Sequence, residues 1–162
     1  MPIRDAYFDN LDYEIIQALH ENARVAASEI ARKTGANERT IRKRIERLIQ
    51  GDVIRLTAIL NPLAFGYITA ADIFIQVDPE RETEVIDALM AMPAVTYVAF
   101  GQGTNEISIE ARFKDNDAFR EFIRTTLAKM EGVSVDRYAL VPRILRNIDE
   151  WMPSRDDFGL EE

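Results

Sequence analysis

The sequence of 162 residues predicts an α+β fold, in which an N-terminal winged helix-turn-helix domain precedes a βαββαβ domain of the ferredoxin-like type. Three observations lead to this fold. Apolar residues in the first third of the chain recur at the spacing of amphipathic helices. Later segments rich in β-branched and aromatic residues alternate with helical patterns. The charge also divides, because residues 1–60 carry ten basic and nine acidic side chains, whereas residues 61–162 carry ten and nineteen. We therefore expect domains at 1–60 and 61–146, followed by an acidic tail at 147–162.

Two helices are predicted at the start of the first domain. Leu11, Ile15 and Leu19 recur on one helical face, which predicts a helix over 11–22 with Asn10 or Asp12 as its cap. A short second helix is expected over 28–34, with Ser28 as its cap. Gly35 would end this helix, because glycine accepts the left-handed conformation that follows many helices.

A third helix is expected over about 37–50, capped by Asn37 and followed by an extended segment at 53–60. Helix, helix, glycine turn, helix and strand form the order of a winged helix-turn-helix. Arginine can bond guanine edges and phosphates, and Thr and Asn can bond bases or phosphates. The alternative interpretation is a solvated helix face, but the order of elements favours DNA binding. The predicted DNA-contacting residues are Asn37, Arg39, Thr40, Arg42, Lys43, Arg44 and Arg47, the last two holding phosphates or bracing the domain.

The second domain alternates strand and helix. The expected elements are strands at 68–77, 95–100, 106–113 and 133–145, and helices at 80–92 and 115–130. This βαββαβ order places two helices on one face of an antiparallel sheet and leaves the other face bare. A second copy of the chain is the simplest cover, so we expect a homodimer through the sheets, with Tyr97, Tyr138 and Ile107 as contributors. In the tail, Trp151, Met152 and Phe158 indicate that part of it docks on a domain.

A glycine-rich turn between two expected strands is the candidate small-molecule site. It consists of Gly101, Gln102, Gly103, Thr104, Asn105 and Glu106. Exposed backbone N–H groups can bind a carboxylate and Glu106 can bind an ammonium group, which together would hold an α-amino acid. The alternative interpretation is a plain hairpin turn.

Composition argues against other classes of protein. The chain contains no cysteine, which excludes disulfides, thiolate zinc sites and a cysteine nucleophile. Its one histidine, His20, is not part of a catalytic triad or a metal-ligand pattern. We therefore expect no enzymatic activity, no cofactor and no metal. No apolar run approaches the ~20 residues of a membrane span, and the N-terminus lacks the apolar stretch of a secretory signal. The expectation is a cytoplasmic protein without a membrane partner.

Along nearly its whole length, the chain resembles the Lrp/AsnC (leucine-responsive/asparagine regulator) family of transcription regulators. The matching residues are Leu11-Asp12, Ile15-Ile16, Leu19, Asn22-Ala23-Arg24, Glu29-Ile30-Ala31, Gly35, Arg39-Thr40-Ile41, Arg44-Ile45, Arg47-Leu48, Gly51, Val53-Ile54, Asn61-Pro62 and Gly66-Tyr67.

The resemblance implies a sequence-specific regulator whose recognition helix, at about 37–50, lies in the major groove of double-stranded DNA. It also implies a C-terminal RAM-type domain that forms homodimers and larger assemblies, such as a tetramer or octamer. In relatives, an amino acid or similar effector binds between dimers near the turn at 101–106. Two positions depart from the family pattern: Ala36-Asn37 stands where Leu-Ser is common, and Glu106 stands where Asp is usual.

The sequence is also compatible with two alternative functions. One is an architectural protein that compacts DNA with low sequence preference. The other is a metabolite-binding regulatory subunit whose helix-turn-helix contacts only protein.

Overall fold

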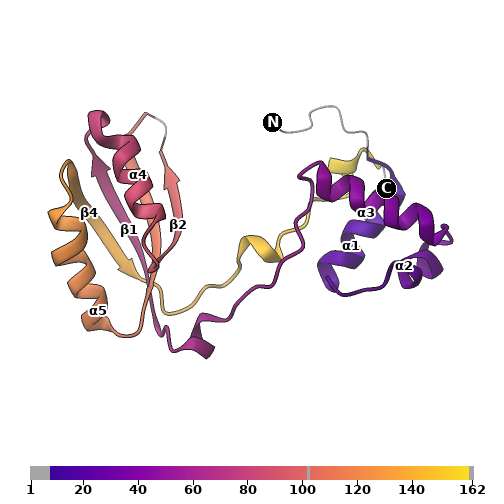
Figure 1. Ribbon diagram of the computed structural model, residues 1–162, viewed down its shortest axis with the longest axis horizontal. Coiled ribbons are helices and arrows are strands. Elements are labelled where there is room, and N and C mark those ends of the chain that lie inside the picture. The colour runs from indigo at the N-terminus through magenta and orange to yellow at the C-terminus, as the bar shows by residue number, and fades with distance from the viewer. Residues whose placement is uncertain (1–7, 102, 161–162) are drawn as a thin grey trace. The chain divides into compact units, whose positions relative to one another are not determined.

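The computed structural model describes residues 8–101 and 103–160 of the chain. The chain forms two compact units (Figure 1). The first unit ends at Ile59 and resumes at Arg146, so it combines the N-terminal helices with the C-terminal tail. The second unit consists of Leu60–Leu145. Within the described residues, no helix has the length and apolar character needed to cross a membrane.

Three helices build the first unit: α1 (Asn10–Glu21), α2 (Ala27–Thr34) and α3 (Glu38–Gln50). Their apolar faces meet in one core, in which Ile15, Ile30, Ile41 and Leu48 are at most 1% exposed. Gly35 follows α2 with φ 72°, the left-handed conformation that glycine adopts without steric cost. The predicted helix, turn and helix at 28–50 are therefore confirmed.

Two of the predicted helix caps were wrong. Asp9, rather than Asn10 or Asp12, caps α1, and its carboxylate accepts a hydrogen bond of 3.0 Å from the Asp12 N–H. The helix α2 begins before Ser28, because Ile30 enters the core and its N–H bonds the Ala26 carbonyl. Only the predicted cap of α3 is confirmed.

The expected wing strand at 53–60 is not formed, since no element of the described chain pairs with this segment. A 3-10 helix, Pro62–Phe65, follows it and ends at Gly66 with φ 77°. The first unit is therefore a helix-turn-helix without a regular wing.

The second unit has the predicted βαββαβ order. Its strands are β1 (Thr69–Val77), β2 (Val95–Phe100), β3 (Glu106–Phe113) and β4 (Val133–Leu140), and its helices are α4 (Glu82–Met90) and α5 (Asn116–Glu121). The sheet order is β2-β3-β1-β4 with every pair antiparallel. The expected α+β architecture is thus confirmed.

Strict alternation along β1 and β3 gives the sheet two different faces. Ile73, Ile75, Ile107 and Ile109 point to one face and are at most 1% exposed. Both helices cover this face, because Val85 and Leu89 of α4 and Phe119 of α5 belong to the same core cluster.

Several expected details of the second unit differ from the structure. Ile107 cannot contribute to a bare sheet face, because it lies in the core below the helices. Tyr138 packs edge-to-face on Phe119 of α5, and so it is also on the helix side. The last strand ends at Leu140 rather than at residue 145, since only Ala71 and the residues after it pair with β4. The α4 helix starts at Glu82 because Pro79–Arg81 forms a 3-10 turn before it.

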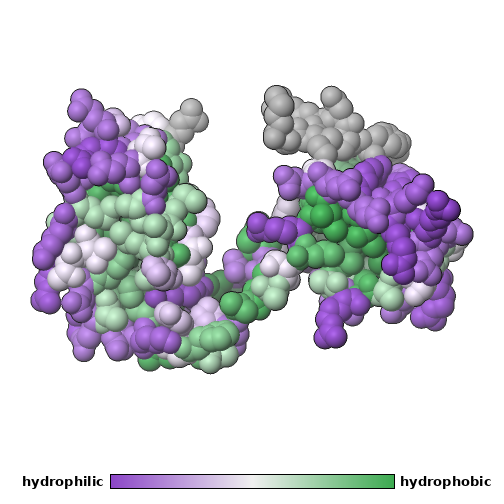
Figure 2. Space-filling model, in the orientation of Figure 1, coloured by the Kyte–Doolittle hydropathy of each residue, from purple (hydrophilic) through white to green (hydrophobic). Residues whose placement is uncertain are grey.

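Apolar side chains remain at the surface of the two segments that connect the units, as Figure 2 shows for the face in view. Between α3 and β1, the exposed large apolar residues are Leu56, Ile59, Leu60, Leu63, Phe65 and Ile68. After β4 they are Ile144, Leu145, Ile148 and Trp151. Such a concentration of exposed apolar groups is typical of a surface that meets another chain.

Candidate nucleic-acid interface and effector turn

The first turns of α3 expose a basic surface. Asn37 caps the helix through a hydrogen bond of 2.8 Å from the Arg39 N–H to its side-chain oxygen. Because Ile41 and Leu48 are buried, the other sides of the helix face solvent. The exposed residues of this surface are Arg39, Thr40, Arg42 and Lys43, all predicted to contact DNA. Three cations and a hydroxyl group therefore lie within about one helical turn.

Arg42 has an exposed partner on its own helix. Its Nη2 lies 2.6 Å from Glu38 Oε1, four residues earlier, and both side chains are more than 40% exposed. Exposed pairs of this spacing contribute only about 0.3–0.5 kcal/mol. The guanidinium can therefore leave Glu38 for a phosphate or a base at little cost.

Arg44 and Arg47 lie in a different environment from the exposed cations. Both donate hydrogen bonds to Asp12 Oδ2, Arg44 at 2.9 Å and Arg47 at 2.6 Å. Asp12 is completely buried, and Arg44 also lies 2.8 Å from Asp9 Oδ2. A buried carboxylate requires such partners, because an unpaired charge away from water is costly. Of the two roles expected for these arginines, bracing α3 against α1 is the one with visible contacts.

The ion cluster shifts the pKa values of two of its members. Burial alone would raise the pKa of Asp9, but the Asp12 N–H and the Arg44 guanidinium outweigh it and hold this pKa below its ordinary value. Hydrogen bonds to Asp12 and Asp9 raise the pKa of Arg44. Asp9 and Arg44 are therefore both charged at neutral pH.

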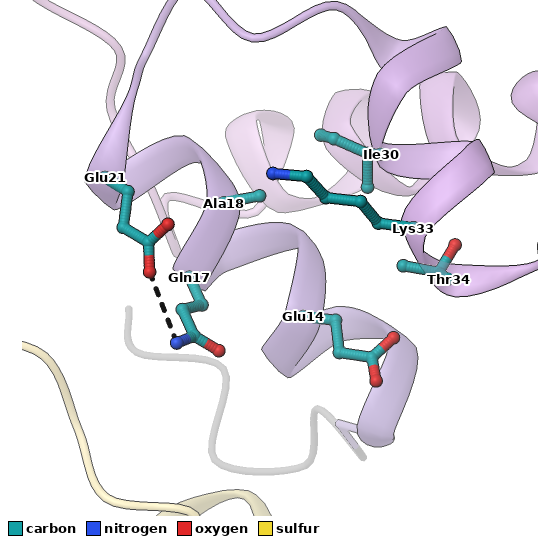
Figure 3. Close-up of a pocket in the computed structure, with 7 residues that line it drawn as sticks. All are labelled: Glu14, Gln17, Ala18, Glu21, Ile30, Lys33 and Thr34. Atoms are coloured by element: carbon teal, nitrogen blue, oxygen red, sulfur yellow. Dashed lines mark hydrogen bonds between the residues drawn. The ribbon is translucent and has the colours of Figure 1, made fainter.

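A hollow of about 270 Å³ lies between α1 and α2 (Figure 3). Polar side chains line most of it, including Glu14, Gln17, Glu21 and Lys33, and Gln17 donates a hydrogen bond of 3.4 Å to Glu21. Sequence reasoning did not single out these residues. The hollow lacks the predominantly apolar walls that are typical of small-molecule sites.

The glycine turn between β2 and β3 satisfies much of its own hydrogen-bonding capacity. The Gly101 N–H donates to the Glu106 carbonyl at 2.8 Å, and the Thr104 hydroxyl donates to the Gly101 carbonyl at 3.2 Å. Gly103 and Asn105 have φ values of 86° and 52°, as a tight turn requires. Gln102 lies outside the described residues. At least one N–H group that we expected to be available to a ligand is therefore used within the turn.

Glu106 is bound to a cation of the same unit. Its Oε2 lies 3.0 Å from Arg137 Nη1 of β4, and Arg137 also contacts Asp136 at 2.8 Å. The Arg137 guanidinium lies 3.9 Å above the ring of Phe74 in β1. Hydrogen bonds to Glu106, and then to Asp136, raise the pKa of Arg137. An incoming ammonium group would have to share Glu106 with this arginine.

Comparison with known proteins identifies both units. Residues 8–49 match the AsnC-type helix-turn-helix domain, and residues 71–142 match the Lrp/AsnC ligand binding domain. The chain belongs to the Lrp/AsnC family. It is a transcriptional regulator with a DNA-binding helix-turn-helix domain and a ligand-binding domain.

Several relatives of this Lrp/AsnC protein match it along most of its length. An uncharacterized HTH-type transcriptional regulator of Pyrococcus abyssi is 30% identical, over 91% of this chain and 92% of the relative. The HTH-type transcriptional regulator FL11 of Pyrococcus furiosus is 31% identical, over 88% and 94% of the two chains. The structure of E. coli AsnC superposes with a TM-score of 0.80 and 26% identity, and covers 89% of this chain and 99% of AsnC.

Two contacts of this Lrp/AsnC protein were missed from the sequence. The sequence suggests Asp12 as a helix cap and as a family residue but not as a buried ion-pair partner, although its spacing places it on the same side of α1 as Ile15, Ile16 and Leu19. An acidic residue within an apolar helical stripe signals a buried ion pair. The pairing of Glu106 with Arg137 joins residues 31 positions apart, and no local pattern predicts it.

Proposed function

We propose that this regulator binds a two-fold symmetric DNA site as a homodimer, with α3 of each copy in the major groove. The exposed basic turn of α3, which Asn37 caps and which follows α2 and its glycine turn, is the observation that carries this proposal. Paired recognition helices require half-sites one or more helical turns apart.

The residues of α3 then divide into two groups. Arg39, Thr40, Arg42 and Lys43 contact bases or nearby phosphates, because they are exposed and can reach a groove. Asn37 holds the start of the helix and stands close to the backbone of the DNA. Arg44 and Arg47 hold α3 on α1, and Arg47, with about half of its side chain exposed, can still approach a phosphate.

A second copy of the chain covers surfaces that a single copy leaves open. The sheet face opposite the helices carries Phe74 and Tyr97, and Tyr97 is largely exposed. The connecting segments add the exposed apolar residues described above. We propose a dimer through these surfaces, and dimers can associate further into tetramers or octamers.

The proposed effector is an amino acid or a related metabolite that binds at residues 101–106. A transcriptional regulator of Neisseria meningitidis forms a complex with L-methionine, and it shares the fold at a TM-score of 0.78 with 22% identity. In this chain, Glu106 and Arg137 would offer one negative and one positive group to a zwitterion. We also propose that the protein is cytoplasmic and has no catalytic role, because the family that the chain matches consists of transcription regulators.

One experiment tests this proposal most directly. The full chain would select bound duplexes from random DNA, with and without a pool of amino acids. We expect an approximately palindromic motif whose enrichment changes with the pool. A specific-to-random affinity ratio near one would favour an architectural protein. Failure to bind DNA at any salt concentration would favour a metabolite-binding regulatory subunit. An unchanged motif and enrichment with every amino acid would contradict the effector.

A further inference from the structure

The C-terminal tail is an integral part of the first unit. Residues from Arg146 onward group with α1, α2 and α3 rather than with the sheet that precedes them in the chain. Phe158 is only 8% exposed and belongs to the same core cluster as Ile15 and Leu19. Met152 and Leu160 pack against this cluster, whereas Trp151 is more than half exposed. The tail therefore contributes its own anchor to the helical core. The prediction that part of the tail docks is confirmed, through Phe158 and Met152 rather than Trp151.

A short local structure presents the anchor. Asp156–Phe158 forms a 3-10 turn that ends at Gly159, whose φ is 69°. The Ser154 N–H and hydroxyl both donate to Asp157 Oδ2, at 2.9 and 2.8 Å. These bonds lie within the turn and hold the backbone around Phe158 in place, which limits the conformational freedom of the anchor.

Phe158 contacts both residues that enclose the first turn of α1. Its ring meets Phe8 edge-to-face at a centroid distance of 5.6 Å and Tyr13 at 5.2 Å. Phe8 precedes the cap and Tyr13 is the fourth residue of the helix, which are the two positions of a hydrophobic staple. Arg155 adds a hydrogen bond of 3.1 Å to Asn10 and lies 5.1 Å from the centre of the Tyr13 ring.

The same turn of α1 holds the recognition helix. Between Phe8 and Tyr13 lie Asp9 and Asp12, whose carboxylates cap one another's backbone and also bind Arg44 and Arg47 of α3. A contact that fixes the staple therefore fixes the two carboxylates, and these in turn fix α3.

We propose that the C-terminal tail is a clasp that positions the recognition helix for reading DNA, acting through Phe158, the first turn of α1 and the Asp9–Asp12 carboxylates. Phe158 is thus a positioning residue rather than a DNA contact. The inference rests on the proposed reading of DNA by α3. Since the tail directly follows the sheet unit in the chain, the clasp also attaches that unit to the DNA-binding helices a second time, through the noncovalent docking of the tail, besides the covalent segment before β1.

The test compares Phe158→Ala with Met90→Ala, which removes an exposed apolar side chain of α4 that belongs to none of the proposed interfaces. Affinities of the full-length variants would be measured for the duplex selected by the wild type and for a random duplex. The temperature would be one at which circular dichroism shows each variant folded. We expect Phe158→Ala to weaken binding to the selected duplex about tenfold, the size of a lost base contact, and to lower the specific-to-random ratio. In Phe158→Ala, the backbone amide hydrogens of α3 should also exchange with solvent faster than in the wild type. Phe158→Leu, which keeps an apolar anchor, and Met90→Ala should stay within about threefold of wild type, which is under 1 kcal/mol.

Other outcomes decide against the clasp. Wild-type affinity and wild-type α3 exchange in Phe158→Ala would overturn it, and so would an equal loss for both duplexes, which indicates a role in stability alone. If Phe158→Ala does not fold, Arg155→Ala decides, because it removes the contacts with Asn10 and Tyr13 but leaves the core intact. We then expect a smaller loss of the specific-to-random ratio, and an unchanged ratio overturns the proposal. Absence of specific binding by the wild type would contradict the proposed function instead.

Discussion

The carboxylate of Asp12 in α1 lies 2.6 Å from the guanidinium of Arg47 in α3 and has no exposed surface. Its second oxygen has no hydrogen-bond partner among the described residues, so the charge depends on Arg47, Arg44 and the Asp9 N–H, which all bond Oδ2. The recognition helix is therefore held on the domain by a charged side chain that solvent cannot reach. A buried pair of this kind adds modest net stability, but it is costly to break on one side.

Removing this carboxylate should destabilise the helix-turn-helix. We expect Asp12→Ala to lower the free energy of unfolding of the first unit by about 3 kcal/mol, because Arg47 loses its carboxylate partner, Arg44 keeps only Asp9, and a cavity remains. Urea unfolding followed by circular dichroism measures the change. Glu21→Ala, a removal of an exposed carboxylate from the same helix, should change the free energy by less than about 0.5 kcal/mol. An equal effect of the two substitutions would refute this role of Asp12.

The lowered pKa of Asp9 predicts how this stability depends on pH. A carboxyl group whose folded pKa lies below its unfolded pKa stabilises the fold above the unfolded value, near 3.8, and the stabilisation is lost as the pH falls through the folded pKa. Asp9→Asn keeps a good helix cap but removes the titrating charge. The difference in unfolding free energy between wild type and Asp9→Asn should thus be constant from pH 7 to 5 and shrink below pH 4. A difference that stays constant down to pH 2 would contradict the shift.

The sequence predicted the order of helices and strands better than it predicted the helix caps and the segment between the units. Apolar periodicity located α1 and α3 and all four strands, because burial against a core imposes a period that local sequence displays. It misplaced the caps of α1 and α2. Ser28 has a favourable cap chemistry, but packing of Ile30 starts α2 earlier. The strand expected at 53–60 has β-branched residues but no neighbouring strand, and a lone strand leaves its backbone hydrogen bonds unmade.

The candidate site was predictable only as far as it is local in the sequence. The exposed cations of α3 follow from helical spacing, since Ile41 and Leu48 define the buried side. Which arginines of α3 are free to contact DNA and which hold the helix on α1 depends on Asp12. This residue lies 32 positions before Arg44, and only the tertiary fold brings the two side chains together. Phe158 reaches α1 from the other end of the chain for the same reason.

The exposed cations of α3 should differ in how they affect DNA binding. If Arg42 reads a base, Arg42→Ala should weaken specific binding by about 1–3 kcal/mol and relax the preference at one position. If Lys43 contacts a phosphate, Lys43→Ala should weaken binding to all duplexes equally and reduce the slope of log K against log salt by about one. Fluorescence anisotropy at several salt concentrations distinguishes these effects. Arg120→Ala, which removes an exposed arginine from α5, is the control. Wild-type affinity and salt slope in both α3 variants would contradict these assignments.

Binding of an amino acid at the glycine turn should depend on Glu106. If the effector's ammonium group binds this carboxylate, Glu106→Ala should weaken binding at least about tenfold, which is the loss of one charge-assisted hydrogen bond. Calorimetry on the wild type and the variant, with the amino acid that changes DNA selection, measures the effect. Glu121→Ala removes an exposed carboxylate of α5 and serves as the control.

Because Glu106 also binds Arg137, Arg137→Ala separates two modes of recognition. If Arg137 holds the carboxylate of the effector, this variant should lose affinity as well. If Arg137 only competes with the ammonium group, its removal should tighten binding. Unchanged affinity in both Glu106→Ala and Arg137→Ala would place the effector elsewhere.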